Sequence, residues 1–171
     1  LKLLFEQTFH EARKNFQEIF RKLFQGGKAD MFLSFEPSKS EDLLEAGIEI
    51  VAQPPGKQLT SINLLSGGER SLTAVAILFA LFKVRPSPFC ILDEVDAALD
   101  ETNVERFLRV LRDFTHGTQF CIVTHHKRTM AECQVLYGIT MQHRGVSSRI
   151  AVSLEQVDSI QDGGAAVGAG A

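Results

Sequence analysis

Two acidic residues that follow an apolar run are the side chains of this sequence best suited to chemistry. Asp93 and Glu94 come directly after Phe89-Cys90-Ile91-Leu92, a run typical of a buried strand. Open α/β sheets bind ligands at the carboxyl ends of their strands, and a rigid carboxylate there suits Mg²⁺. We predict that Asp93 is the metal ligand. Glu94 points to the other side of the strand, so we predict that it orients or deprotonates a water molecule that attacks a phosphate.

A second candidate site is Ser66-Gly67-Gly68-Glu69, which precedes a helix-forming run from Leu72 to Val84. A hydroxyl and unobstructed backbone N–H groups at the positive end of a helix dipole bind phosphate. Taken alone, this tetrapeptide is more often a turn with a helix cap. It gains weight because Asp93-Glu94 follows about two dozen residues later, as expected of two parts of one nucleotide site.

His125 is the third candidate, because it lies just past the apolar run Gln119 to Val123. At the end of a parallel strand its imidazole can hydrogen-bond a terminal phosphate or the attacking water. His126 serves as the internal comparison. The remaining histidines are interpreted as ordinary surface or structural groups: His10, His116 and His143.

The loop that would wrap the phosphates of a nucleotide is missing from this sequence. No Gly-x-x-x-x-Gly-Lys-Ser/Thr occurs in its 171 residues. We therefore expect another polypeptide segment to supply that loop. The chain also begins without methionine and within a helical pattern, so it is predicted to be a fragment of a longer protein.

Bulk composition is that of one ordinary globular domain. Apolar residues make up 44% and charged residues 23%, with a net charge of −3 that exerts no overall attraction for nucleic acid. The three cysteines, Cys90, Cys121 and Cys133, fit no zinc pattern and are interpreted as buried thiols of a reducing compartment. No run has the length needed to cross a bilayer. A cytoplasmic protein is predicted.

The elements that must position these residues can be outlined from periodicity. Phe5, Phe9, Ala12, Phe16, Ile19 and Leu23 form a heptad seam that predicts a helix, either a core helix or the end of a coiled coil. Gly26-Gly27 ends it. Met31 to Phe35 and Gly47 to Gln53 are predicted to be neighbouring antiparallel strands.

The second half of the chain predicts a parallel arrangement. The runs 89–92 and 119–123 bracket a helix from about Asn103 to Phe114, which favours two parallel strands buried on both faces. Val135 to Met141 and Ser148 to Leu154 are predicted to form a hairpin through Arg144-Gly145. The Gly- and Ala-rich tail cannot build a core.

Together these motifs resemble the C-terminal half of an ATP-binding-cassette (ABC) ATPase. The chain is more specifically similar to the head domain of bacterial structural maintenance of chromosomes (SMC) proteins. The resemblance covers residues 1 to about 154 and rests on five segments in the same order: Phe16 to Asp30, Pro54 to Lys57, Leu64 to Arg70, Phe89 to Asp100, and Thr124 to Lys127. It departs from the family at His126 and Lys28, neither of which is a proposed site residue.

The resemblance implies an α/β fold: the C-terminal lobe of an ABC-type head, with a mixed sheet and flanking helices. Residues 1–25 would be the end of a returning coiled-coil arm, residues 26–157 the lobe, and residues 158–171 a flexible tail. It also implies residue roles. Ser66 to Glu69 would be the signature motif, Asp93 the Walker B magnesium ligand and Glu94 the catalytic base, with Asp100 in the D-loop and His125 as the switch histidine.

The implied cofactors are ATP and Mg²⁺, and the implied activity is ATP hydrolysis at a site shared between two heads. Ser66-Gly67-Gly68 of one head would close on nucleotide held by its partner, and hydrolysis would drive DNA entrapment in chromosome condensation and segregation. The implied partners are the N-terminal lobe of the same SMC protein, a second identical head, a kleisin-type subunit and nucleoid DNA.

Two other functions remain open at this point. The chain could be half of another cassette ATPase of the superfamily, from DNA repair or from a transporter. The transporter reading is disfavoured, because a coiled-coil-like helix and two strands stand where transporters carry a helical insert. Alternatively, the isolated chain could be a non-catalytic module for kleisin binding or dimerisation.

Overall fold

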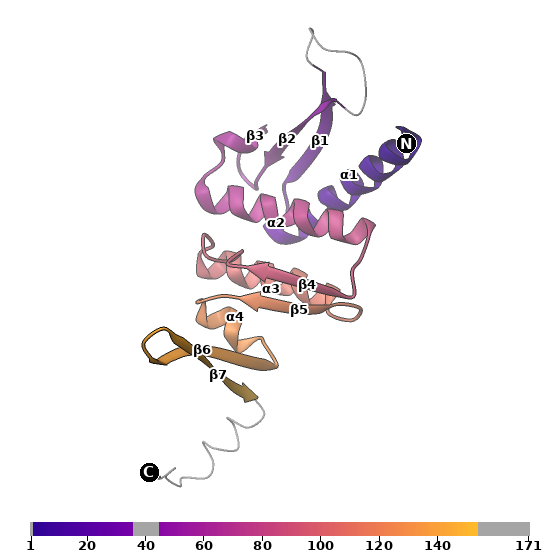
Figure 1. Ribbon diagram of the computed structural model, residues 1–171. Coiled ribbons are helices and arrows are strands. Elements are labelled where there is room, and N and C mark those ends of the chain that lie inside the picture. The colour runs from indigo at the N-terminus through magenta and orange to yellow at the C-terminus, as the bar shows by residue number, and fades with distance from the viewer. Residues whose placement is uncertain (1, 36–44, 154–171) are drawn as a thin grey trace, which may run out of the picture. The chain divides into compact units, whose positions relative to one another are not determined.

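The computed structural model describes residues 2–35 and 45–153 (Figure 1). The chain forms two compact units, Leu1–His126 and Lys127–Ala171, each of which is described by itself. Helices are combined with both parallel and antiparallel strand pairs, as the predicted α/β class requires. The described strands form three separate sheets. The predicted tail and Leu154 lie outside the described residues.

The first helix, α1, spans Lys2–Phe24 and confirms the helix predicted from the heptad seam. Five of the six seam residues are buried, and only Phe5 near the N-terminal end is half-buried. The helix packs against α2, α3 and β1. From Phe9 onward α1 is therefore a core helix of this unit, which is one of the two alternatives that the pattern left open. The boundary at residue 25 and an arm preceding the lobe stay predictions.

The turn after α1 uses three residues with positive φ: Gln25 at 58°, Gly26 at 141° and Gly27 at 74°. A Cβ on Gly27 would lie 2.3 Å from the carbonyl oxygen of Gln53, so no other residue fits there without moving the backbone. A Cβ on Gly26 would lie 3.5 Å from Cγ of Pro55. The glycine pair thus ends the helix and brings its end close to the loop Pro54 to Lys57, called the proline loop below.

An antiparallel sheet follows, made of β1 (Lys28–Ser34), β2 (Gly47–Gln53) and the short β3 (Thr60–Ser61). The predicted antiparallel pairing of β1 and β2 is confirmed, with Asp30 opposite Val51. The two-residue β3 and the 3-10 turn η1 (Ile62–Leu64) were not predicted, because neither is long enough to show a period. This segment leads from the sheet to Ser66.

Helix α2 spans Gly67–Val84 and begins five residues before the apolar run that predicts it. The glycines weaken the helical pattern, but Ser66 and Glu69 form a capping box that begins the helix at Gly67. Arg85-Pro86 follows its last residue, as predicted.

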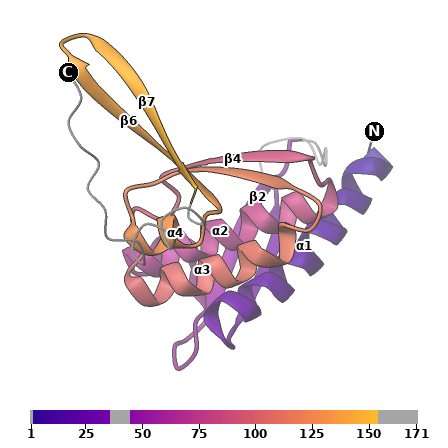
Figure 2. The same cartoon turned by 90° about the horizontal axis from the view of Figure 1, so that it is seen from below.

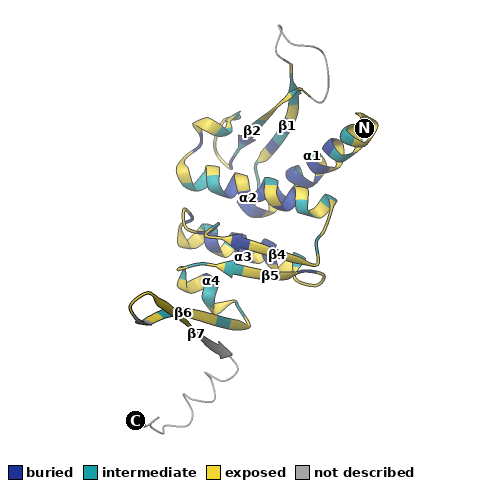
Figure 3. Cartoon of the chain, in the orientation of Figure 1, coloured by how far each residue is buried: buried dark blue, intermediate teal, exposed yellow. Residues whose placement is uncertain are grey.

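The parallel pair consists of β4 (Phe89–Asp93) and β5 (Gln119–Val123), joined through α3 (Glu101–Phe114). Asp93 lies opposite Val123, so both strands end at the same edge. The prediction that these strands are buried on both faces is wrong. Phe89, Ile91 and Val123 are 64%, 65% and 50% exposed, whereas Leu92 is 3% exposed. Exposed residues alternate with more buried ones along β4 and β5 (Figure 3). One face of this two-stranded sheet packs on the helices. The other face carries apolar side chains that no other described residue covers.

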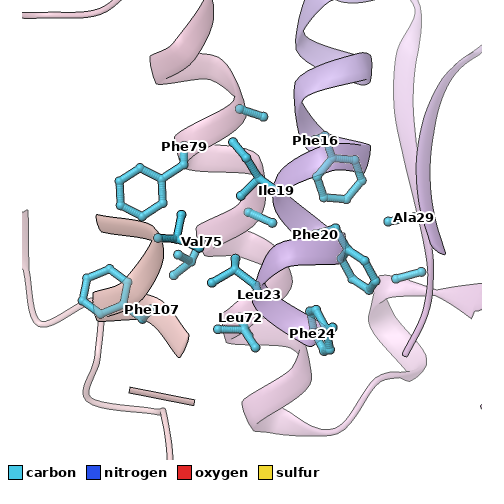
Figure 4. Close-up of a cluster of buried hydrophobic side chains, with 14 of the residues drawn as sticks. Phe16, Ile19, Phe20, Leu23, Phe24, Ala29, Leu72, Val75, Phe79 and Phe107 are labelled. Carbon is cyan, nitrogen blue, oxygen red and sulfur yellow. The ribbon is translucent and has the colours of Figure 1, made fainter. Parts of the chain in front are cut away.

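The core of this unit lies between the helices. Helices α1, α2 and α3 run side by side (Figure 2). Four phenylalanines are buried almost completely: Phe16, Phe20, Phe79 and Phe107 (Figure 4). Phe79 stacks on Phe114 at a ring-centroid distance of 4.9 Å, and Phe120 from β5 meets Phe79 edge-on. Aromatic packing therefore fixes the parallel strands on the helices.

The second unit contains α4 (Lys127–Ala131) and a hairpin of β6 (Val135–His143) and β7 (Val146–Ser153). The predicted hairpin is confirmed: the strands are antiparallel and Gly145 has a φ of 84°. Across the described ranges of both units, no helix combines the length and the apolar character that a bilayer crossing demands.

Candidate functional site

Asp93 and Glu94 lie at the carboxyl edge of the parallel pair, where the sequence places them. Asp93 is the last residue of β4 and is exposed. Glu94 adopts a left-handed φ of 47°, and its N–H donates a hydrogen bond of 2.9 Å to the carbonyl of Val123 at the end of β5. The left-handed conformation of Glu94 thus turns the chain directly after the last residue of β4.

The structure brings Glu94 and His125 together. Oε1 of Glu94 lies 3.7 Å from Nδ1 of His125, and the two side chains are 60% and 69% exposed. This distance is longer than a hydrogen bond. A water molecule or a phosphate oxygen could therefore contact both groups from solvent, as predicted for a base and a phosphate-sensing imidazole.

A partly buried hydrogen-bond chain holds the loop that carries His125. Thr124 donates from Oγ1 to Oδ2 of the fully buried Asp96 at 2.7 Å, and the N–H of His126 donates to Oγ1 of Thr124 at 2.9 Å. The loop after β4 is thereby fixed to the loop after β5. No specific role was predicted for Thr124 or Asp96 from the sequence, because their pairing spans 28 positions.

Ser66 and Glu69 are linked at the start of α2. The Glu69 carboxylate accepts from the N–H of Ser66 at 3.2 Å and from its hydroxyl at 2.8 Å. Lys57 contacts both carboxylate oxygens, at 2.9 Å and 3.0 Å. The hydrogen bond from Lys57 lowers the pKa of Glu69, and the hydrogen bonds from Ser66 act in the same direction against partial burial. Sequence reasoning missed Lys57 as a site residue.

Asp100 caps α3. Its Oδ1 accepts from the backbone N–H of Asn103 at 2.7 Å, and its Oδ2 accepts from the side-chain amide of the same residue at 3.2 Å. Arg106 donates to Oδ1 of Asn103 at 3.2 Å. The D-loop position that the resemblance assigns to Asp100 is therefore tied to the first turn of α3.

Ser66, Gly68, Glu69 and Asp100 line one pocket of about 700 Å³, and Gly67 is not part of its lining. Gly68 lies against α3, because a Cβ there would be 3.5 Å from Nδ2 of Asn103. Glu94, Asp93 and His125 do not line this pocket. The predicted site residues thus form two groups, one at the strand edge and one at the mouth of α2. The pocket lining comprises Phe24, Gln25, Pro54, Pro55, Ser66, Gly68, Glu69, Asp100, Thr102, Asn103 and Arg106.

The donor set fits a magnesium ion carried by a nucleotide better than a metal held by protein alone. Within residues 2–35 and 45–153, no cluster of three His, Cys, Asp or Glu side chains could enclose a metal ion. Mg²⁺ commonly uses only one or two protein carboxylates and takes its other ligands from phosphate oxygens and water. The exposed Asp93 carboxylate at the strand end is compatible with that role.

Sequence comparison identifies relatives of this chain. Residues 1–148 match the RecF/RecN/SMC N terminal domain family. The chromosome partition protein Smc of Bacillus subtilis is 56% identical over 152 residues, which are 89% of this chain and 12% of that protein. This chain therefore spans about an eighth of the length of its Smc relatives. An uncharacterized Rhodospirillum rubrum protein, encoded 3′ of ATPase CF(0) subunits, is 51% identical, and 88% of its length is covered.

Solved structures agree with the sequence relatives. One comes from structural work on ATP-driven dimerization and DNA-stimulated activation of SMC ATPases. It has a TM-score of 0.79 and 36% identity, with 95% of this chain and 96% of that chain covered. A Smc head bound to the C-winged helix domain of ScpA has a TM-score of 0.78 and 39% identity, with 91% and 47% covered. The agreement with solved structures shows that this chain has the fold of an SMC ATPase head. The family match and the identity to Smc proteins show that it is a member of the RecF/RecN/SMC family.

Proposed function

We propose that this chain is the C-terminal lobe of an SMC ATPase head, and that it supplies the catalytic base to one ATP and the signature serine to another. The observation that carries the proposal is the pairing of Glu94 with His125 at the carboxyl edge of β4 and β5, 3.7 Å apart and open to solvent. The separate pocket that holds Ser66 and Asp100 supports a second role in the partner head's site.

The missing half is expected to be the N-terminal lobe of the same SMC protein. The sequence has no phosphate-wrapping loop. The uncovered apolar face of the parallel pair, with Phe89, Ile91 and Val123, is a surface on which further strands and helices can pack. Both observations support a head that is complete only when two lobes join.

In the proposed reaction, Glu94 accepts a proton from the attacking water. A bond forms between the water oxygen and the terminal phosphorus, and the bond from that phosphorus to the bridging oxygen breaks, so that ADP and phosphate leave. His125 hydrogen-bonds the water or the terminal phosphate. Mg²⁺ held by Asp93 would neutralise charge on the phosphate oxygens.

By the same proposal two heads join around two ATP molecules, and turnover separates them. SMC ATPases with this fold have been studied for ATP-driven dimerization and DNA-stimulated activation, and a Smc head has been solved with part of ScpA. We extend these properties to this chain: DNA and a kleisin-type subunit are its proposed partners, and chromosome condensation and segregation in the cytoplasm is its proposed role.

The test uses a head assembled by co-expressing the full chain with an SMC lobe that carries a phosphate-binding loop. Glu94→Gln should leave ATP-driven dimerisation intact and lower turnover at least 100-fold, because the base is lost while the side-chain shape stays. Glu49→Gln on β2, another exposed glutamate, is the control and should hydrolyse ATP normally.

Nucleotide binding provides an independent check on the composite site. The chain alone should bind ATP weakly, and addition of the complementary lobe should create tight binding. Normal turnover in the Glu94→Gln head would refute the assignment of the base. Equally tight binding by the chain alone would refute the proposal that its phosphate-wrapping loop lies elsewhere.

A further inference from the structure

Lys57 contacts the same carboxylate as the signature serine, and neither the motif pattern nor the proposed reaction gives it a role. It belongs to the loop between β2 and β3, and its side chain is 56% exposed. Its ammonium group contacts both oxygens of Glu69, whose own side chain is only 19% exposed. The ion pair therefore fixes the orientation of a carboxylate that is largely removed from water.

That carboxylate determines where the Ser66 hydroxyl points. Ser66 donates to Oε2 of Glu69 from both its backbone N–H and its Oγ. A carboxylate whose two oxygens both contact one ammonium group has little freedom to rotate away. The chain of contacts therefore runs from Lys57 through Glu69 to Ser66.

The backbone of Lys57 is itself held in a defined turn. Its N–H donates to the carbonyl of Pro54 at 3.1 Å, and its carbonyl accepts from Nε2 of Gln53 at 3.0 Å. Gly56 supplies a φ of 76°, which suits glycine in the turn. A lysine on a defined turn can act as a fixed support rather than as a freely moving surface charge.

Charge at the mouth of α2 gives this arrangement a second consequence. Two carboxylates, those of Glu69 and Asp100, and one guanidinium group, that of Arg106, line the pocket beside Ser66, so the carboxylates outnumber the cation. An approaching triphosphate is repelled by uncompensated negative charge, despite the favourable end of the helix dipole. Lys57 neutralises the carboxylate that contacts the serine directly.

We propose that Lys57 is a positioning residue for ATP-driven head closure, which acts through Glu69 by orienting the Ser66 hydroxyl and by cancelling negative charge beside it. The proposal rests on the proposed function, in which Ser66 meets nucleotide held by the partner head. In this proposal Glu69 acts by holding the serine in place.

The test compares Lys57→Met with Lys83→Met in the assembled two-lobe head described above. Lys83 is the matched control, because its Nζ also forms an exposed ion pair at 3.0 Å, with Glu18, at the far end of α2. Lys57→Met should lower kcat about tenfold, the scale of one lost charge-assisted hydrogen bond. KM should change less than twofold, because ATP binds first to the lobe that carries the phosphate loop. Lys83→Met should leave both constants unchanged.

Two further readouts separate positioning from a general loss of structure. Lys57→Arg should recover most of the rate. The acid limb of the kcat profile should move to higher pH in Lys57→Met, because loss of the ammonium group allows the pKa of Glu69 to rise towards its ordinary value. Lys83→Met should show no such movement.

A double substitution tests whether Lys57 acts through Glu69. In a Glu69→Gln background, Lys57→Met should lower kcat less than twofold, because the carboxylate to be neutralised is gone. An equal tenfold loss in both backgrounds would overturn the proposal, and so would a Lys57→Met head that matches Lys83→Met. These results overturn the Lys57 proposal alone if the wild-type head hydrolyses ATP and the Glu94→Gln head does not. A wild-type head without ATP hydrolysis would overturn the proposed function itself.

Discussion

Glu94 occupies a backbone conformation that costs free energy. A non-glycine residue at a φ of 47° is uncommon, and such residues cluster at functional sites where the surrounding structure enforces them. Here the hydrogen bond from Glu94 N–H to Val123 fixes the turn. In this turn the Glu94 carboxylate lies 3.7 Å from His125.

Replacement of Glu94 by asparagine should therefore stabilise the chain. Asparagine tolerates the left-handed region, so Glu94→Asn should raise the free energy of unfolding by about 0.5–1 kcal/mol, measured by urea denaturation. Glu94→Gln keeps the conformational preference of glutamate and should leave stability unchanged. Equal stabilities of the two variants would show that the backbone at residue 94 carries no strain.

Asp30 provides a pH-dependent prediction at the same scale. Arg13 donates from Nε and Nη2 to its two carboxylate oxygens, both at 2.6 Å, and Gln17 donates at 3.0 Å. The Arg13 hydrogen bonds lower the pKa of Asp30, although partial burial opposes them. The stability gained is fully present above the ordinary aspartate pKa of about 4 and is lost as pH falls through the lower folded-state pKa.

Asp30→Asn should thus cost about 1 kcal/mol of unfolding free energy at pH 7, and the cost should shrink as the pH falls through the folded-state pKa. The control is Asp113→Asn, which removes a more exposed ion pair with Lys22 and should change stability by less than about 0.5 kcal/mol. Urea titrations between pH 2 and pH 7 measure both, and a loss that does not depend on pH would contradict the linkage.

Residue types and spacing predicted the location of Asp93, Glu94, Ser66 and His125 because local sequence carries their signals. An acidic pair after an apolar run and a serine before a helix are short-range patterns. The 3.7 Å approach of Glu94 to His125 was foreseen only in part, as a shared strand edge. The contacts of Lys57 were not predictable, because they join a loop to a helix that begins ten residues later.

At the scale of elements, the junction between α1 and the proline loop constrains the fold most tightly. Gly27 combines a φ of 74° with a site where any Cβ would lie 2.3 Å from a backbone oxygen. Periodicity predicted where α1 ends but not this close approach, since the sequence does not show which backbone faces the turn.

Gly27→Ala should consequently cost at least 3 kcal/mol, the sum of the left-handed strain and a backbone clash. Gly56→Ala isolates the cost of the left-handed backbone conformation. Its φ of 76° is nearly the same and a Cβ there would meet nothing within 4 Å, so it should cost only about 1–2 kcal/mol. Thermal and urea denaturation of the two variants would test the difference. Similar losses of unfolding free energy would show that the backbone at Gln53 moves to accommodate the new methyl group.

Element boundaries were harder to predict than element types. Helix α2 was placed correctly: the cap predicted at Ser66 begins it at Gly67, five residues before the apolar run from Leu72, because a side-chain cap outweighs the poor helical propensity of two glycines. The antiparallel pairing of β1 with β2 and the parallel pairing of β4 with β5 were both predicted. Alternation and crossover length decide these pairings, and both are visible in sequence.

At the scale of the whole molecule, the misjudged feature is the burial of β4 and β5. A continuous apolar run predicts a strand covered on both sides, but in this chain Ile91 is 65% exposed while Leu92 is buried. The apolar residues of a strand suit its surroundings in the complete assembly. The burial of a strand in one chain depends only on the neighbours within that chain. The misprediction is therefore informative about the proposed second lobe.

Substitutions on the two faces of β4 should separate folding from lobe joining. Ile91→Thr should change the unfolding free energy of this chain by less than about 0.5 kcal/mol, because the side chain is already exposed. It should nevertheless weaken co-purification with the complementary lobe. Leu92→Thr removes a buried side chain and should cost about 2–4 kcal/mol in the chain alone. Unaltered lobe joining by the Ile91→Thr chain would place the interface elsewhere.

The open parallel pair also affects how the chain behaves in solution. A two-stranded sheet has unpaired main-chain amides and carbonyls along its two edges. This sheet also exposes apolar side chains on one face. Identical chains at high concentration could stack through that surface and pair at those margins. Purified material should therefore show a critical concentration for aggregation, and co-expression with the proposed complementary lobe should raise that concentration.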